Sequence, residues 1–269
     1  MIDFHVHFFP HRVFNAIWNY FEKSSNDLWK IKYKIFGQDL INELKANGIK
    51  RFTTLVYAHK PGMADFLNEF IYDILKQFPE VIPFGTIFAG DGECRKTAEK
   101  IFLQYNFTGI KLHPFVSKEN VDDERFFPAY DIMEKNKKIL VCHPGSAPVY
   151  DKTDGALRIE NILRNFPRLK IVIAHCGAFE YGDYTKISER FETVYFDTAM
   201  NCTHTPVFIN NCPGKDFFLH FQDKILFGSD FPNIPYKYSN QIDSIKNLKL
   251  GDEFEQKVFG ANALKLLSL

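Results

Sequence analysis

The sequence predicts an α/β fold of the TIM (β/α)8 barrel class, formed as a single domain over residues 1–269. The first observation is a series of eight short apolar, β-rich runs, each followed by a longer stretch with helical periodicity. The second is their spacing, which after the first interval averages about 29 residues, enough for one strand, one helix and two loops. The third is that no Pro/Gly/Ser-rich linker or low-complexity segment divides the chain.

Each expected strand is a short run rich in β-branched and aromatic residues. The eight runs begin at Ile2, Arg51, Ile82, Gly109, Ile139, Lys170, Val194 and Ile225. A doubly wound open sheet is the alternative fold, but it would normally carry a Gly-rich fingerprint after its first strand, and this sequence has none.

Each expected helix occupies a gap between two runs and shows helical spacing of apolar residues. The Asn47-Gly48 pair is a typical stop signal for the first of them, and Asp252 is a typical start for the last, which carries an amphipathic stripe. The expected helices span Gln38–Ala46, Met63–Phe78, Cys94–Tyr105, Arg125–Lys137, Ala156–Phe166, Lys186–Phe191 and Asp252–Leu267.

The first interval is 49 residues long, which leaves an insertion from residue 8 to residue 36 after the first strand. In a barrel this segment rises over the C-terminal face, where active sites lie. It holds nine aromatic residues in 29, including both tryptophans. These side chains either form a small core of their own or make a water-excluding cover that determines which substrate is accepted.

Composition narrows the function classes. The 33 basic and 33 acidic residues cancel, so neither nucleic acid nor an anionic membrane surface is an expected partner. No apolar run is long enough to span a membrane, and the N-terminus lacks the features of a signal peptide. The five cysteines are widely spaced without a CxxC pair, so no disulfide framework or zinc knuckle is expected. We expect a soluble cytoplasmic protein with a small-molecule substrate and apolar helix faces that could support a homodimer.

Five residues at predicted strand ends carry the chemistry. His5 and His7 form an HxH pair on one face of the first strand, while His143, His175 and Asp230 end the fifth, sixth and eighth strands at the same rim. Surface or capping histidines are the alternative for HxH alone, but five such groups at one rim are hard to explain as packing. Imidazole and carboxylate are ligands for Zn, Fe or Mn, so four of the residues would bind a metal whose water has a lowered pKa. His175 would stand beside that water as acid, base or electrophile.

Seven stretches in order along the chain carry a resemblance to a known family. They are IDFHVH at the start, GIKLHP (109–114), VCHPG (141–145), IVIAHCG (171–177), VYFDTA (194–199), ILFGSDFP (225–232) and FGANALKLL (259–267). Together they resemble the amidohydrolase superfamily, in the branch of the amidohydrolase-2 hydrolases and the aminocarboxymuconate semialdehyde decarboxylases. This resemblance implies a metal, usually one Zn²⁺, on His5, His7, His143 and Asp230, with His175 activating the water. A second metal, or Mn or Fe, stays open.

Lys111 falls where binuclear relatives carry a carboxylated lysine that bridges two metals, although the single-metal form is favoured. Lys111 and His113 share a strand face, so either could contact substrate; a buried lysine with a paired ammonium is the other interpretation. Loop and insertion residues are further candidates for substrate binding, against the default of a solvated surface position. They are Arg12, Trp18, His59 and Lys60.

The leading hypothesis is hydrolysis of a small amide, lactone or related ester by a metal-bound hydroxide, with Asp230 carrying the proton to the leaving group. The alternative is non-oxidative decarboxylation of an aromatic or muconate-like acid on the same metal. A cation aimed at the substrate carboxylate would separate the two, and Arg12, Lys60 and Lys111 are candidates. A catalytically silent binding protein is the third hypothesis, disfavoured because all five key residues are present.

Overall fold

The computed structural model of the protein describes residues 1–24, 29–146, 153–203 and 212–268. The chain divides into two compact units. Unit 1 consists of Met1–Thr53 and Phe196–Leu269, and unit 2 consists of Thr54–Tyr195. The expectation of one domain over residues 1–269 stays a prediction.

Unit 1 contains the first and the last strands of the chain. β1 (Ile2–Asp3) pairs in parallel with β2 (Arg51–Thr53), and the C-terminal half of β8 (Val194–Asp197) pairs in parallel with β9 (Ile225–Leu226). The segments that follow β1 and β9 also run side by side, because Val6 and Phe231 form a parallel bridge. First and last strands are neighbours in a closed barrel, whereas in a doubly wound sheet the first strand lies in the interior.

Three helices of unit 1 are not among those expected from the sequence, at His11–Ser24, Lys215–His220 and Tyr238–Lys246. α1 (His11–Ser24) forms inside the insertion expected at residues 8–36 and buries Phe14 and Trp18; residues 25–28 of the insertion lie outside the described residues. The expected final helix is present but contains a π-helical turn at Lys257–Ala261. The other helices are α2 (Gly37–Ala46), α9 (Lys215–His220), α10 (Tyr238–Lys246), α11 (Asp252–Gln256) and α12 (Asn262–Leu267).

Unit 2 holds a parallel sheet in which β4 (Phe84–Gly85), β5 (Gly109–Leu112), β6 (Ile139–Cys142) and β7 (Lys170–Ile173) pair in chain order. Every residue of β5 and β6 is buried, as expected for parallel strands covered on both faces. The expected third strand is divided into β3 (Val81–Ile82) and β4. Pro83 separates them, because proline has no N–H to donate to a sheet ladder.

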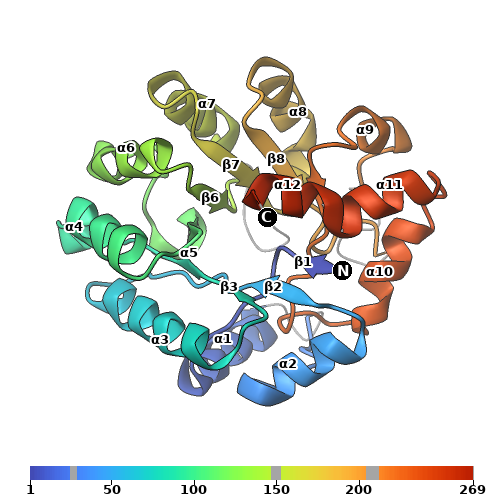
Figure 1. Cartoon of the computed structure of the whole chain (residues 1–269), viewed down its shortest axis with the longest axis horizontal. Helices are drawn as coiled ribbons and strands as arrows, with labels where there is room; N and C mark the ends of the chain where they lie inside the picture. The colour runs from blue at the N-terminus through green and yellow to red at the C-terminus, as the bar shows by residue number, and fades with distance from the viewer. Residues whose placement is uncertain (25–28, 147–152, 204–211, 269) are drawn as a thin grey trace. The chain divides into compact units, whose positions relative to one another are not determined.

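Apart from the short helix at Pro114–Ser117, the helices of unit 2 lie outside these strands (Figure 1). α8 begins at Tyr181, earlier than the helix expected from Lys186, and the expected helix at Cys94–Tyr105 continues past α4 as a π-helical turn at Lys100–Gln104. Short 3₁₀ segments occur at Ala89–Asp91, Glu124–Phe126 and Ala174–Glu180. The α-helices are α3 (Met63–Gln77), α4 (Cys94–Glu99), α5 (Pro114–Ser117), α6 (Phe127–Lys135), α7 (Gly155–Asn165) and α8 (Tyr181–Arg190).

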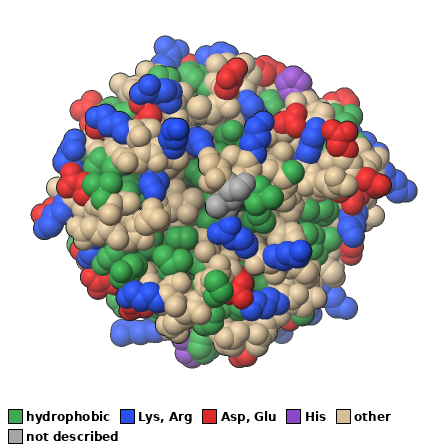
Figure 2. Space-filling view, viewed as in Figure 1, with side chains coloured by type: hydrophobic (Ala, Val, Ile, Leu, Met, Phe, Trp, Pro, Cys, Tyr) green, Lys and Arg blue, Asp and Glu red, His purple; other side chains and the backbone are tan. Residues whose placement is uncertain are grey.

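The surface matches the neutral composition. Acidic and basic side chains are interspersed over the face shown in Figure 2. Within the described part of the chain, none of the helices combines the length and the apolar character that a membrane crossing requires.

Cys202 and Cys212 form a disulfide with their Cα atoms 5.0 Å apart. No disulfide framework was expected from the sequence, and this single bridge was not predicted. Spacing in sequence does not determine which two cysteines come within bonding distance in the fold. Cys94, Cys142 and Cys176 are buried and do not belong to this disulfide.

Candidate metal centre

Two imidazoles and one carboxylate converge in unit 1. Nε2 of His5 and Nε2 of His7 each lie 3.0 Å from Oδ1 of Asp230, and all three residues are at least nine-tenths buried. The two histidines point the same way because they are two positions apart in extended chain. The Asp230 backbone N–H donates to the carbonyl oxygen of His5 at 2.8 Å, which brings the end of β9 beside the end of β1. The structure thus brings together three of the predicted ligands.

The Asp230 carboxylate is held in its charged form. Burial alone would raise its pKa, but the charge of His7 and the contacts with both imidazoles outweigh burial and hold the pKa of Asp230 well below its ordinary value. Asp230 also has a left-handed backbone with φ of 67°, which is uncommon for a residue other than glycine. Such backbone outliers gather at functional sites.

Asp197, at the end of β8, orients His5. Its Oδ2 lies 2.8 Å from Nδ1 of His5, and both side chains are fully buried. A proton on Nδ1 leaves a lone pair on Nε2, which then faces the Asp230 oxygen at 3.0 Å. Two acceptors at this distance require a proton or a cation between them. Two imidazoles and a carboxylate form a donor set that suits a divalent ion, and a carboxylate behind one imidazole is the usual support for a metal-binding histidine.

A second buried carboxylate joins the two ligand-bearing segments. Asp3 accepts hydrogen bonds from the backbone N–H groups of His5 and Ser229, and from the hydroxyls of Ser229 and Tyr238. Burial raises the pKa of Asp3 to about 6, although these hydrogen bonds oppose the shift. Neither Asp3 nor Asp197 was assigned from the sequence. The signals were present: Asp3 shares the face of His5 and His7, and Asp197 ends a predicted strand.

Three imidazoles gather in unit 2 at the ends of β5, β6 and β7. The rings of His113 and His143 stack with centroids 4.4 Å apart, and His143 meets His175 edge to face at 4.6 Å. His143 and His175 are buried, and His113 is half-buried against the ring of Tyr57 at 5.1 Å. The predicted ligand His143 and the predicted acid-base residue His175 are therefore direct neighbours.

The predicted substrate contacts differ in exposure. Lys111 is almost completely buried in β5, as the alternative interpretation of a buried strand residue requires. Arg12 on α1 and His59 after β2 are exposed, and partial burial and nearby Lys60 lower the pKa of His59. Trp18 is buried.

The aromatic insertion packs against the segment that follows Asp230. The indole N–H groups of Trp18 and Trp29 donate to the side-chain oxygen and the backbone carbonyl of Asn233, at 3.0 and 2.9 Å. A series of ring contacts leads from the site into the insertion: His7 stacks on Phe9 at 5.8 Å, and Phe9, Phe14 and Trp18 follow at 5.5 and 5.1 Å. The aromatic residues of the insertion therefore form a small core, as one interpretation of the sequence predicts, whereas a cover that determines the substrate stays a prediction.

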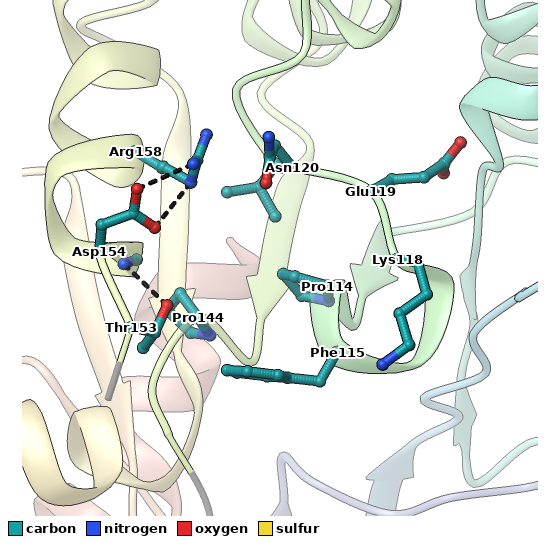
Figure 3. Close-up of a pocket in the computed structure, with 11 residues that line it drawn as sticks. Pro114, Phe115, Lys118, Glu119, Asn120, Pro144, Thr153, Asp154 and Arg158 are labelled. Carbon is teal, nitrogen blue, oxygen red and sulfur yellow. Dashed lines mark hydrogen bonds and ion pairs between the residues drawn. The ribbon is translucent and has the colours of Figure 1, made fainter. Parts of the chain in front are cut away.

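A cavity of about 240 Å³ opens in unit 2 (Figure 3). Pro114 and Pro144, which follow His113 and His143, line it together with Phe115. The Phe115 ring meets the His143 ring edge to face at 6.4 Å, so a molecule in the cavity would lie one side chain away from this imidazole. The guanidinium of Arg158 is bound to Asp154 and Asp122, which compensate its charge. Lys118 and Glu119 also line the cavity, so it combines an apolar wall of Pro114, Phe115 and Pro144 with a charged rim.

Comparisons with known proteins agree with this fold. The chain matches the amidohydrolase family model over residues 2–269. It is similar to an uncharacterized TIM-barrel protein of Bordetella bronchiseptica, with 19% identity, a TM-score of 0.74 and coverage of 100% of this chain and 99% of that one. A 2,6-dihydroxybenzoate decarboxylase bound to 2,6-dihydroxybenzoate gives 15% identity, a TM-score of 0.74 and coverage of 100% and 99%.

A third similar structure is the 5-carboxyvanillate decarboxylase of Novosphingobium aromaticivorans, complexed with manganese and a nitrobenzoic acid. It gives 16% identity, a TM-score of 0.71 and coverage of 100% of this chain and 95% of that one. A comparison with curated proteins gave no match. The full-length structural matches confirm the predicted TIM-barrel fold. With a family match that spans nearly every residue, the chain belongs to the amidohydrolase family.

Proposed function

We propose that the protein is a metal-dependent decarboxylase that removes CO2, without oxidation, from an aromatic or muconate-like carboxylic acid. One observation carries the proposal: two imidazoles converge on the Asp230 carboxylate at 3.0 Å, and a series of aromatic rings begins at His7, the second imidazole. This setting favours a planar acid beside a divalent ion. The similar structures of 2,6-dihydroxybenzoate and 5-carboxyvanillate decarboxylases support the same substrate class.

We assign one metal ion to His5, His7, His143 and Asp230, with His175 beside it. This assignment is supported by the barrel fold, because the carboxyl ends of all strands in a barrel meet at one rim. Three imidazoles and a carboxylate suit zinc, which is our proposed metal. Manganese, which one similar structure carries, and iron suit the same donors, and a second ion at Lys111 is the binuclear alternative. When bound, the ion would supply positive charge that holds the substrate carboxylate.

The side chains of the protein would orient the ligands, donate the proton, contact the substrate and exclude water. Asp197 holds His5 in one orientation through Nδ1. When the bond between the substrate carbon and CO2 breaks, the electron pair stays on that carbon, and a proton held by His175 completes the product. Lys111 on β5 and His113, which directly follows that strand, would meet the polar substituents of the substrate, with Arg12, Trp18 and His59 as weaker candidates. The rings of Phe9 and Phe14, which meet edge to face, would exclude water.

Hydrolysis of a small amide, lactone or ester is the second candidate. The observation in its favour is the same donor set, because two imidazoles and the Asp230 carboxylate would hold a divalent ion that lowers the pKa of a bound water. The two reactions use the same ligands, and the similar decarboxylases favour the first.

A small-molecule substrate, a homodimer, and the absence of nucleic-acid or membrane partners all stay predictions. A cytoplasmic location stays a prediction too, and the Cys202–Cys212 disulfide weighs against it, because disulfides persist mainly in oxidising compartments.

The test is a paired assay on one metal-analysed preparation. We expect CO2 release from hydroxybenzoates or carboxyvanillates, measured as ¹³CO2 from carboxyl-labelled acids, and no opening of a lactone panel. His175→Asn serves as the inactive control. Lactone or amide hydrolysis without CO2 release would replace the proposal with the hydrolase candidate.

A further inference from the structure

A buried carboxylate in unit 2 joins the loops that carry His143 and His175. Glu180 ends the 3₁₀ segment after β7 and is more than nine-tenths buried. Its Oε2 accepts the backbone N–H of Ser146 at 2.9 Å, and its Oε1 accepts the hydroxyl of Ser146 at 2.6 Å. Ser146 lies three positions after His143, and Glu180 lies five positions after His175. The carboxylate therefore bridges the two loops close to both imidazoles.

Glu180 does not make the hydrogen bond that is usual for an acidic residue at the start of a helix. Glu180 immediately precedes α8, where an acidic side chain normally accepts an N–H from the first turn of its own helix. No such bond is made here. Both oxygens instead receive donors from the other loop. A general acid or base would need an oxygen directed at substrate, so the geometry indicates positioning rather than proton transfer.

The loop after β7 needs external support. His175, Cys176, Gly177 and Ala178 form an unbroken run with φ between 51° and 88°, and three of the four are not glycine. L-residues adopt this left-handed conformation only at a cost, so such a run persists when neighbouring structure holds it.

The neighbouring loop packs directly against this run. A Cβ added to Gly145 would lie 2.7 Å from the carbonyl oxygen of Gly177, and a Cβ on Gly177 would collide with the ring of Tyr184. The two loops are thus in backbone contact, with the Glu180–Ser146 bonds at one end of that contact. At the other end the rings of His143 and His175 meet at 4.6 Å and 63°.

We infer that Glu180 is a positioning residue: its carboxylate locks the loop after β6 to the loop after β7, and so sets the relative placement of the His143 and His175 imidazoles. The effect on turnover rests on the proposed function, because it requires His143 as a ligand and His175 as the proton donor. The placement of the rings does not, and can be measured in any state of the protein.

Four variants test the inference. Ser146→Ala removes one donor, and Glu180→Gln places an amide where two donors require acceptors. Ser146→Thr keeps the hydroxyl and should restore what Ser146→Ala loses. Ser188→Ala is the matched control, because Ser188 is also a buried serine in unit 2 and its hydroxyl donates to Val194 in β8, away from the two loops.

The first readout is independent of activity. In metal-free protein with ¹³C-labelled histidine, we expect Ser146→Ala and Glu180→Gln to shift the ring signals of His143 and His175, while Ser188→Ala leaves them in place. Unfolding of Ser146→Ala, Glu180→Gln and the double variant should give non-additive losses of stability. Unmoved ring signals together with additive losses would overturn the inference.

The second readout is kinetic. On any acid that the wild type decarboxylates, Glu180→Gln should lower kcat by about 10- to 100-fold with a smaller change in KM, the range seen when support behind a metal site is lost. Ser146→Thr should recover most of the loss caused by Ser146→Ala. If the wild type decarboxylates and Glu180→Gln keeps full kcat, the inference fails while the proposed function stands. If the wild type has no decarboxylase activity but the ring signals move, the proposed function fails and the inference stands.

Discussion

Nδ1 of His5 lies 2.8 Å from Oδ2 of Asp197, although 192 positions separate the two residues in the chain. Both side chains are fully buried, so the carboxylate fixes the proton on Nδ1 and turns Nε2 toward Asp230. This contact links the end of β8 to the segment after β1, and it orients His5, one of the candidate metal ligands.

We expect Asp197→Asn to lower metal affinity by about 10- to 100-fold, because an amide holds the His5 tautomer less firmly than a carboxylate does. Competition against a chromogenic chelator measures the affinity. Asp243→Asn, at an exposed position on α10, is the control and should bind metal like the wild type. Equal affinity for Asp197→Asn and the control would show that His5 is oriented by other contacts.

His175→Asn should abolish turnover and leave metal content near that of the wild type, because His175 is assigned to proton transfer and not to the ligand set. Elemental analysis with an activity assay separates these roles. Asp230→Asn should reduce both metal content and rate, since Asp230 is the carboxylate on which two imidazoles converge. A His175→Asn protein that arrives without metal would mean that His175 is a ligand.

Trp18→Phe should lower the free energy of unfolding by about 1–3 kcal/mol, because it leaves the buried Asn233 side-chain oxygen without its donor. Urea unfolding measures this loss. Tyr20→Phe on the same helix is the control, since Tyr20 is exposed. If the insertion also shapes the substrate site, Trp18→Phe should change KM more for bulky aromatic acids than for small ones. A stability equal to that of Tyr20→Phe would contradict the hydrogen-bonded packing of the insertion.

Protein that is unfolded without reductant and then alkylated should carry the label on three cysteines, because Cys202 and Cys212 are joined. Protein that is reduced before alkylation should carry it on all five. In the folded state Cys142 should resist alkylation, since burial raises the pKa of its thiol to about 12. Mass spectrometry of differentially alkylated peptides counts the thiols. Five free thiols before reduction would show that the bridge does not form in solution.

Local sequence patterns were sufficient for the alternation of strands and helices. The runs at β5, β6, β7 and β8 lie where predicted, because continuous β-branched segments bounded by turns have few alternative structures. The division of the third expected strand at Pro83 could also have been predicted, because proline has no N–H to donate, but a single strand was expected. The aromatic residues of the insertion were expected to form a small core or a cover, and no bounds were predicted for the single helix α1 that they form.

The sequence could not choose between hydrolysis and decarboxylation, because both reactions use the same metal ligands. It did determine the order of the strands and the strand-end positions of the site residues, since periodicity and spacing are local properties. Only the tertiary structure decided which groups support them: Asp197 behind His5, Asp3 between His5 and Ser229, and Glu180 between the loops of unit 2. Apart from the bond between Asp3 and the His5 N–H, these hydrogen bonds join residues 34 to 226 positions apart. They form because burial makes an unsatisfied polar group costly, and no short-range pattern encodes which distant partner will satisfy it.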